Sequence, residues 1–238
     1  MTKIGITERG DAGLDLSWIN KLDTVDGAIL ITKNPTPEFM ELVEKHQDKL
    51  IVHVTITGHG GSKIEPNIPK SERVFFQFKK IAELLGPQKT VLRIDPIIPT
   101  PCGIDKANKI YFESFYYPDH RLRISILDNP FHVNRRFENA GLPTLNYKFH
   151  ESYSKRKEII SYFGDRVEIC GEPGFSSIGC VSNTDLDALG LPRESITLQS
   201  HQRKYCTCLG IKTELLDNRE QCPYKCVYCY WKDKEPEV

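Results

Sequence analysis

The sequence contains no long apolar run, no excess of either charge and no internal repeat. No stretch approaches the roughly 20 apolar residues that a membrane-spanning helix requires, and the N-terminus lacks a charged and then apolar leader. The 32 Lys and Arg residues balance 32 Asp and Glu residues, so no net field draws the chain to nucleic acid or to a membrane surface. We therefore expect a soluble cytoplasmic protein with no membrane partner.

Cysteine is almost missing from the first two thirds of the chain, where only Cys102 occurs. Seven more follow in the final third: Cys170, Cys180, Cys206, Cys208, Cys222, Cys226 and Cys229. The cytosol keeps thiols reduced, so thiols gathered in this way usually bind a metal or carry out chemistry. The cysteine-rich part, residues 166–231, is therefore predicted to hold metal.

The length of 238 residues and the 39% apolar content fit one sizeable core, so a single domain over 1–238 is expected. Short β-branched runs predict strands at 3–7, 27–32, 50–57, 90–95, 122–127, 166–170 and 211–216. Helical patterns lie between them, beginning at Thr36 and covering 71–85 and 151–163. This alternation predicts an α/β fold with a parallel sheet, closed or nearly closed into a (β/α) barrel.

Polar residues follow the predicted strands, where the functional residues of a parallel barrel lie. They are Glu8, Arg9, Asp11, Lys33, Asn34, His59, Glu65, Asp95, Asp128, Asn129 and Glu172. Each could instead be a turn or cap residue, since these residue types favour such positions. A functional site is favoured because these residues are expected to lie on the same face of the barrel.

The spacing C-x3-C-x2-C at Cys222, Cys226 and Cys229 points to an iron-sulfur cluster. A 4Fe-4S cubane takes four thiolates, so three leave one iron open to a chelating molecule such as S-adenosylmethionine (SAM). The cofactors would then carry out the reductive cleavage while the protein orients them. The alternative is structural zinc, in which Cys206 and Cys208 complete a four-cysteine site with the Cys226 and Cys229 pair.

This triplet, with Tyr228 before Cys229, resembles the signature loop of the radical SAM superfamily. In that superfamily the loop normally follows the first barrel strand, whereas here it follows the last predicted strand, 211–216. The resemblance therefore implies a circularly permuted radical SAM TIM-like barrel, a rearrangement that closed barrels tolerate because their termini can lie side by side.

The whole chain is similar to a bacterial family of unknown function with a radical-SAM-like cysteine cluster near its C-terminus. The matching stretches are 31–35, 64–69, 92–97, Gln202, Arg203, and 206–208 leading to the triplet. A weaker similarity to spore photoproduct lyase, which repairs a thymine dimer in DNA, rests on Thr32 with Lys33 and on residues 95–97. It implies that Lys33 pairs with the SAM carboxylate, and that the substrate is a nucleobase or nucleic acid.

Further SAM contacts are expected from Glu8, Asp95 and Tyr228. Arg93 and Asp95 stand two apart on one predicted strand and should project to the same face, where they form a structural ion pair or bind the SAM ribose and the substrate. Aromatic and basic residues mix over 111–123, which suits either nucleic-acid stacking or ordinary packing.

Four cysteines are left after the triplet, the number that a complete cubane or a zinc ion takes. They are Cys170, Cys180, Cys206 and Cys208. The family resemblance implies that they belong to a shared cysteine pattern, so we expect an auxiliary cluster, iron-sulfur in preference to zinc. The alternative is that some are ordinary buried thiols.

Three functions follow from these observations. The first is a radical SAM enzyme that abstracts a hydrogen atom from its substrate and takes electrons from an external donor such as flavodoxin or ferredoxin. The second is a zinc-stabilised binding module, and the third is a two-cluster electron-transfer protein that does not bind SAM. The sequence identifies no catalytic hydrogen donor.

Overall fold

The computed structural model describes residues 2–195, 205–217 and 222–231. Its strands are β1 (Ile4–Ile6), β2 (Gly27–Thr32), β3 (Leu50–Thr55), β4 (Thr90–Ile97), β5 (Arg121–Ile126), β6 (Val167–Ile169) and β7 (Lys212–Glu214). Its α-helices are α1 (Pro37–Lys45), α2 (Ser71–Leu85), α3 (Pro101–Glu113), α4 (Phe131–Asn139), α5 (Tyr153–Ser161) and α6 (Asn183–Ala188). Short 3-10 segments cover Leu16–Thr24, Gln47–Lys49, Ser114–Tyr116 and Gly164–Arg166.

The seven strands form one sheet in the order β6-β5-β4-β3-β2-β1-β7, and every neighbouring pair is parallel. All seven predicted strands are confirmed, and the parallel α/β prediction with them. Strands that neighbour each other in sequence also neighbour each other in the sheet. The last strand is the exception, because β7 returns to pair with β1 through Ile4 and Lys212.

Local sequence signals explain where α1 and α2, which were predicted, and α3, which was not, begin or end. Thr36 caps α1 by accepting a hydrogen bond from the Phe39 amide at 3.3 Å, and Pro37 occupies the first helical turn, where a missing amide costs nothing. Helix α2 ends at Gly86, whose φ of 76° lies in the left-handed region that glycine adopts without strain. Thr100 caps α3 in the same way as Thr36 caps α1.

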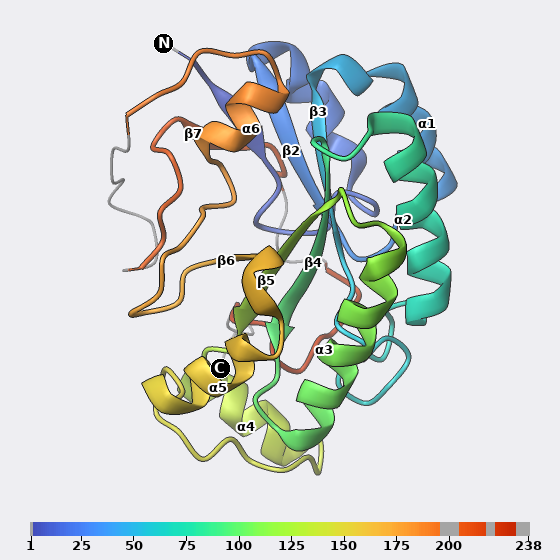
Figure 1. The fold of residues 1–238 in the computed structure, drawn as a ribbon. Coiled ribbons are helices and arrows are strands. Elements are labelled where there is room, and N and C mark those ends of the chain that lie inside the picture. The colour runs from blue at the N-terminus through green and yellow to red at the C-terminus, as the bar shows by residue number, and fades with distance from the viewer. Residues whose placement is uncertain (1, 196–204, 218–221, 232–238) are drawn as a thin grey trace, which may run out of the picture.

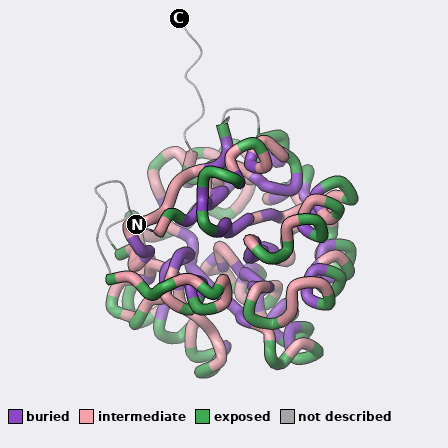
Figure 2. Tube along the Cα trace, turned by 90° about the horizontal axis from the view of Figure 1, so that it is seen from above, coloured by how far each residue is buried: buried purple, intermediate pink, exposed green. Residues whose placement is uncertain are grey.

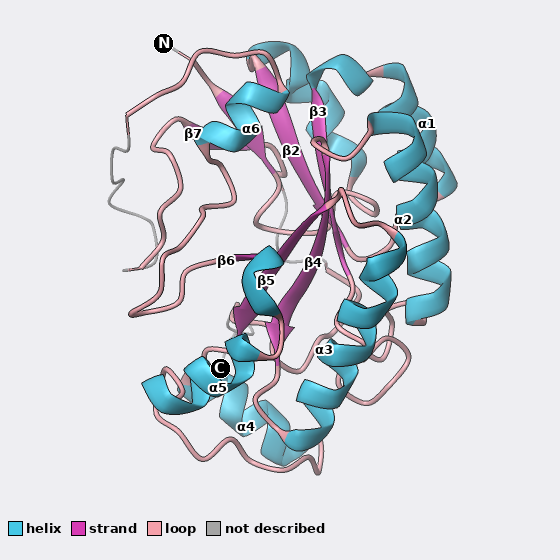
Figure 3. Ribbon diagram, viewed as in Figure 1, coloured by secondary structure: helices cyan, strands magenta, loops and turns pink. Residues whose placement is uncertain are grey.

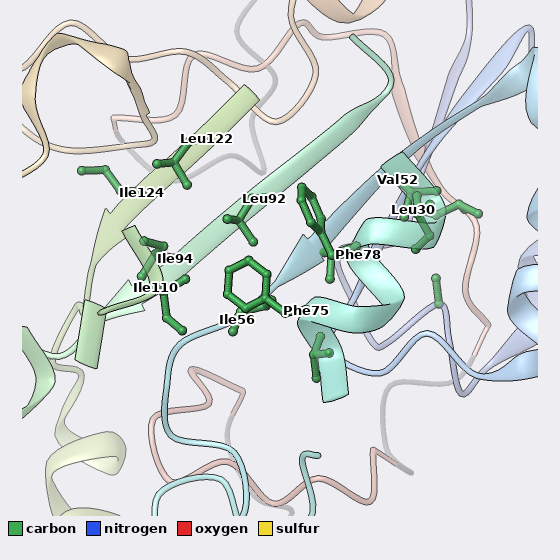
Figure 4. Close-up of a cluster of buried hydrophobic side chains, with 14 of the residues drawn as sticks. Leu30, Val52, Ile56, Phe75, Phe78, Leu92, Ile94, Ile110, Leu122 and Ile124 are labelled. Carbon is green, nitrogen blue, oxygen red and sulfur yellow. The ribbon is translucent and has the colours of Figure 1, made fainter. Parts of the chain in front are cut away.

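Helices α1, α2 and α3 cover one face of the sheet (Figures 1 and 3). Phe75 and Phe78 of α2 pack against Leu92 and Ile94 of β4, as the close-up shows (Figure 4). Seen from above, the buried segments gather in the middle of the molecule (Figure 2). Burial of these large side chains stabilises the fold by roughly 1.5 to 3 kcal/mol for each side chain.

Strands β6 and β7 are the two edges of the sheet. Within the described ranges they do not pair with each other, so a closed barrel is not seen and the observed architecture is an open parallel sheet. Loops fill the side between these edges (Figure 3). No helix in the described part of the chain has both the length and the apolar character needed to cross a membrane.

Candidate functional site

The loop that carries the cysteine triplet lies at the carboxyl ends of β2 and β3. On one side it meets the segment after β3, where the Val227 amide donates to the Ile64 carbonyl at 3.0 Å. On the other side it meets α4, where Arg136 donates to the carbonyl oxygen of Cys229. Nε2 of His132 lies 2.6 Å from the carbonyl oxygen of Tyr230. The triplet loop is therefore held at the end of the sheet where parallel α/β proteins place their ligands.

Lys33 and Glu65 form a buried ion pair beneath this loop. The Lys33 ammonium lies 3.1 Å from Glu65 Oε1, Thr57 donates to Glu65 Oε2 at 2.7 Å, and the Tyr228 hydroxyl donates to Glu65 Oε1. The ammonium also lies 5.4 Å from the centre of the Tyr228 ring. Burial alone would raise the pKa of Glu65, but Lys33 and the hydrogen bonds from Tyr228 and Thr57 hold it below its usual range.

Asp11 anchors the chain around Lys33. Its carboxylate accepts hydrogen bonds from the Lys33 amide at 2.6 Å, the Thr32 hydroxyl at 2.6 Å and the Gly13 amide at 2.8 Å. Burial nevertheless raises the pKa of Asp11 to about 6, because desolvation of the charge outweighs these bonds. Asp11 therefore fixes the end of β2, from which the Lys33 side chain projects.

The triplet thiols differ in exposure: Cys222 is exposed, while Cys226 and Cys229 are partly buried. Burial raises the pKa of the Cys226 thiol to about 12, and Glu65 adds to this while Lys33 opposes it. A metal that binds here must displace a proton, as soft metal ions do at thiols. Three sulfur donors on one tight loop, turned by Lys225 at a φ of 51°, fit a metal that takes thiolates.

The other four cysteines form a separate group. Cys170, Cys180 and Cys208 are buried and pack with the isoleucines of β1 and β2, whereas Cys226 packs in a different cluster beside Ile98 and Leu127. Cys206 contacts Cys208 rather than the triplet. The described residues therefore do not assemble the four-cysteine zinc site that would combine Cys206 and Cys208 with Cys226 and Cys229.

The remaining predicted site residues, Glu8, Arg93 and Asp95, each take part in an ion pair. Glu8 accepts a hydrogen bond from Lys212 at 2.8 Å and lies beside Cys180 and Cys208, so it belongs to the second cysteine group. Arg93 and Asp95 do project to one face and pair with each other, and Ser125 donates to Asp95.

The basic residues predicted as part of an aromatic and basic mixture lie inside the protein. Arg121 pairs with Glu168 at 2.7 Å and with Asp185 at 2.7 Å, and Arg123 pairs with Glu168 at 2.9 Å between Nε and Oε2. The nearby aromatic side chains of Tyr111, Phe112 and Phe115 contact one another and Phe163. The structure thus uses the basic residues of this stretch for an internal ion-pair network, whereas the side chains of Phe112 and Phe115 are exposed.

A hollow of about 390 Å³ lies at the start of α4, the helix that contacts the triplet loop. Its lining includes the aromatic rings of Phe131 and Phe149, the cation Lys148 and the amide of Asn129. The Oδ1 atom of Asn129 is buried and has no hydrogen-bond partner within the described ranges. The hollow therefore offers aromatic stacking surfaces and one cation.

Sequence reasoning grouped Glu65 and Asp11 with other polar residues after strands but assigned neither a role. The structure makes Glu65 the shared partner of Lys33, Thr57 and Tyr228. A glutamate within the matching stretch 64–69 was the available signal.

Comparison with models of known protein families matches residues 17–231 to a domain of unknown function, DUF1848. The chain belongs to the DUF1848 family. The DUF1848 match begins after β1, so it contains both cysteine groups and Lys33 but neither Glu8 nor Asp11. Neither curated proteins nor solved structures give a match to this DUF1848 protein.

Proposed function

We propose that this DUF1848 protein is a radical SAM enzyme whose SAM-binding cluster is held by Cys222, Cys226 and Cys229. The observation that carries the proposal is the position of the triplet loop, at the carboxyl ends of the parallel strands and directly over the Lys33 and Glu65 pair. Cys222, Cys226 and Cys229 would hold a 4Fe-4S cluster with one iron open to SAM, and the cluster would supply the electron for reductive cleavage of SAM and so for hydrogen abstraction from the substrate.

The protein groups position the cofactor and exclude water. Lys33 supplies an ammonium for the anionic carboxylate of SAM, and only 17% of its side chain is exposed, so the attraction acts in a poorly solvated place. Glu65, fixed by Tyr228 and Thr57, holds Lys33 in position until SAM binds. Tyr228 also covers the inner side of the triplet loop, since its side chain is buried.

The hollow at the start of α4 suits a substrate with a flat ring. Phe131 and Phe149 can stack on a nucleobase, and Lys148 can pair with a phosphate. These features support a nucleobase or nucleotide substrate within the proposed reaction. An external one-electron donor such as flavodoxin or ferredoxin completes the reaction.

The test is the release of 5′-deoxyadenosine by anaerobically reconstituted protein after reduction with SAM. We expect release by the unaltered chain and by Cys102→Ala, which removes an exposed cysteine outside both groups, and none by Cys226→Ala. Zinc without iron in the reconstituted protein would contradict the proposal and support the binding module. Iron and sulfide without SAM binding would instead support an electron-transfer protein.

A further inference from the structure

The second cysteine group lies where the sheet is open. Cys170 follows edge strand β6 directly, and the Ile178 amide donates to the Ile169 carbonyl at 2.8 Å, so the next segment continues from that edge. The Leu209 amide then donates to the Val181 carbonyl at 2.9 Å, and residue 209 leads into edge strand β7. These backbone bonds connect β6 to β7 through the two segments that carry the cysteines.

The thiols of this group converge. The Sγ atoms of Cys170 and Cys180 are 3.7 Å apart, the Cys180 amide donates to Cys208 Sγ at 3.1 Å, and the thiols of Cys206 and Cys208 are in side-chain contact. Cys180 Sγ, Cys208 Sγ and a Glu8 carboxylate oxygen all lie within 4.8 Å of one another. Four thiols from three chain segments thus form a continuous series of contacts in the order Cys170, Cys180, Cys208 and Cys206, of which Cys206 is only partly buried.

The separation of the Cys170 and Cys180 sulfurs matches that of two neighbouring ligands of a single metal ion. Zinc lies about 2.3 Å from each thiolate, so neighbouring sulfurs of a tetrahedral site lie about 3.8 Å apart. A cubane distributes its four thiolates over four irons and holds them farther apart. The 3.7 Å separation of Cys170 and Cys180 therefore favours one ion over a second cluster.

Buried cations surround the group. Arg123 is 0% exposed, interacts electrostatically with Cys180 and Cys170, and its Nη1 atom has no hydrogen-bond partner in the described part of the chain. Lys212 likewise interacts with Cys206 and Cys208. Both cations also pair with carboxylates, Arg123 with Glu168 and Lys212 with Glu8, so the thiols lie within a network of alternating charges that can hold the ligands of a metal in place.

We propose that Cys170, Cys180, Cys206 and Cys208 bind one tetrahedral zinc ion that joins the two edges of the open sheet. The ion ties the end of β6 to the segment before β7, in the place where a further strand pair would otherwise close the sheet. Its role is structural, and it is independent of the reaction proposed for the triplet.

The first test measures metal in a variant whose three triplet cysteines are all alanine, expressed with both iron and zinc present. We expect about one zinc per chain and no sulfide, and the loss of that zinc when Cys180→Ala is added. The full-length unaltered chain should hold about four irons and one zinc. Iron with sulfide in the triple variant, or a folded triple variant without metal, would overturn the proposal.

The second test does not depend on any substitution at the four cysteines. Chelation of zinc from the triplet variant should increase hydrogen exchange at the Ile178 and Leu209 amides, and added zinc should reverse the change. The Leu92 amide, in the central strand β4, serves as the control and should stay protected. Equal exchange at Ile178 and Leu209 with and without zinc would contradict a metal that joins the sheet edges.

Discussion

The two cysteine groups occupy opposite kinds of place in one fold. The triplet Cys222, Cys226 and Cys229 sits on a loop at the carboxyl ends of the strands, with one thiol exposed. The other group is mostly buried between the edges β6 and β7. Metal sites that do chemistry keep an open coordination position, whereas structural sites are closed by protein ligands. Under the two proposals made above, position in the fold, and not the type of ligand, distinguishes the reactive site from the structural one.

The sharpest way to break this comparison is to remove one cysteine from each group. Cys180→Ala should lower the free energy of unfolding by about 4 kcal/mol, because loss of a structural metal removes folding energy. Cys226→Ala should change it by less than about 1 kcal/mol, because the Val227 amide and the Tyr228 side chain still anchor the loop. Urea unfolding of both variants tests this, and equal destabilisation would contradict the assignment of separate roles.

The ion-pair network beside the second group should be the next largest contributor. Arg123→Met leaves buried carboxylates less compensated and removes a cation next to the thiols, so we expect a loss of about 3 to 5 kcal/mol. Lys109→Met, which breaks an exposed pair with Asp105, should leave the stability almost unchanged. Thermal unfolding of the two variants measures this difference. A similar loss of stability in both would show that the ion-pair network contributes little to stability.

The pH dependence of stability should reveal the contribution of the buried Asp11 carboxyl group. Its pKa is about 6 in the folded state, against 3.8 for the ordinary group, so the folded protein binds a proton more readily than the unfolded chain. The Asp11 contribution to stability should therefore rise as the pH falls from about 6 towards 3.8, by up to about 3 kcal/mol. Urea unfolding at several pH values should show this rise in the unaltered chain, and Asp11→Asn should remove it. A rise of the same size in Asp11→Asn would rule out Asp11 as its source.

Glu65 should change the stability in the opposite direction to Asp11 and over a lower pH range. Its folded pKa lies below the ordinary value of 4.5, so its contribution is present above that pH and is lost as the pH falls through the folded pKa. Glu65→Gln should flatten this acidic loss of stability. It should also weaken SAM binding, because Lys33 would lose its fixed partner. Isothermal titration with SAM at pH 7 measures the second effect, and unchanged affinity would show that the pair does not position Lys33.

The strands could be predicted from the sequence because their β-branched runs are local signals, and all seven were found within a few residues. Helix α4 was missed because its sequence is rich in Asn, Arg and His, with only Val133 and Phe137 buried. Helix α6 is only six residues long and offers too little periodicity to recognise.

Contacts between distant segments could not be predicted in the same way. Lys33 was named as a site residue, but its partner Glu65 lies 32 positions away and only the folded chain brings them together. Glu8 was expected to contact SAM, which stays a prediction, and its position beside Cys180 and Cys208 could not be foreseen, because β7 pairs with β1 and brings Lys212 to it. Such positions depend on sheet order, which spacing along the chain does not encode.

The most direct test of the radical SAM assignment is the electron paramagnetic resonance spectrum of the reduced, reconstituted protein before and after SAM is added. SAM that binds an open iron must change the environment of the cluster. We predict that SAM shifts the spectrum of the unaltered chain and of Cys102→Ala, and that Cys226→Ala shows no such shift. A cluster spectrum that is identical with and without SAM would contradict the proposed function.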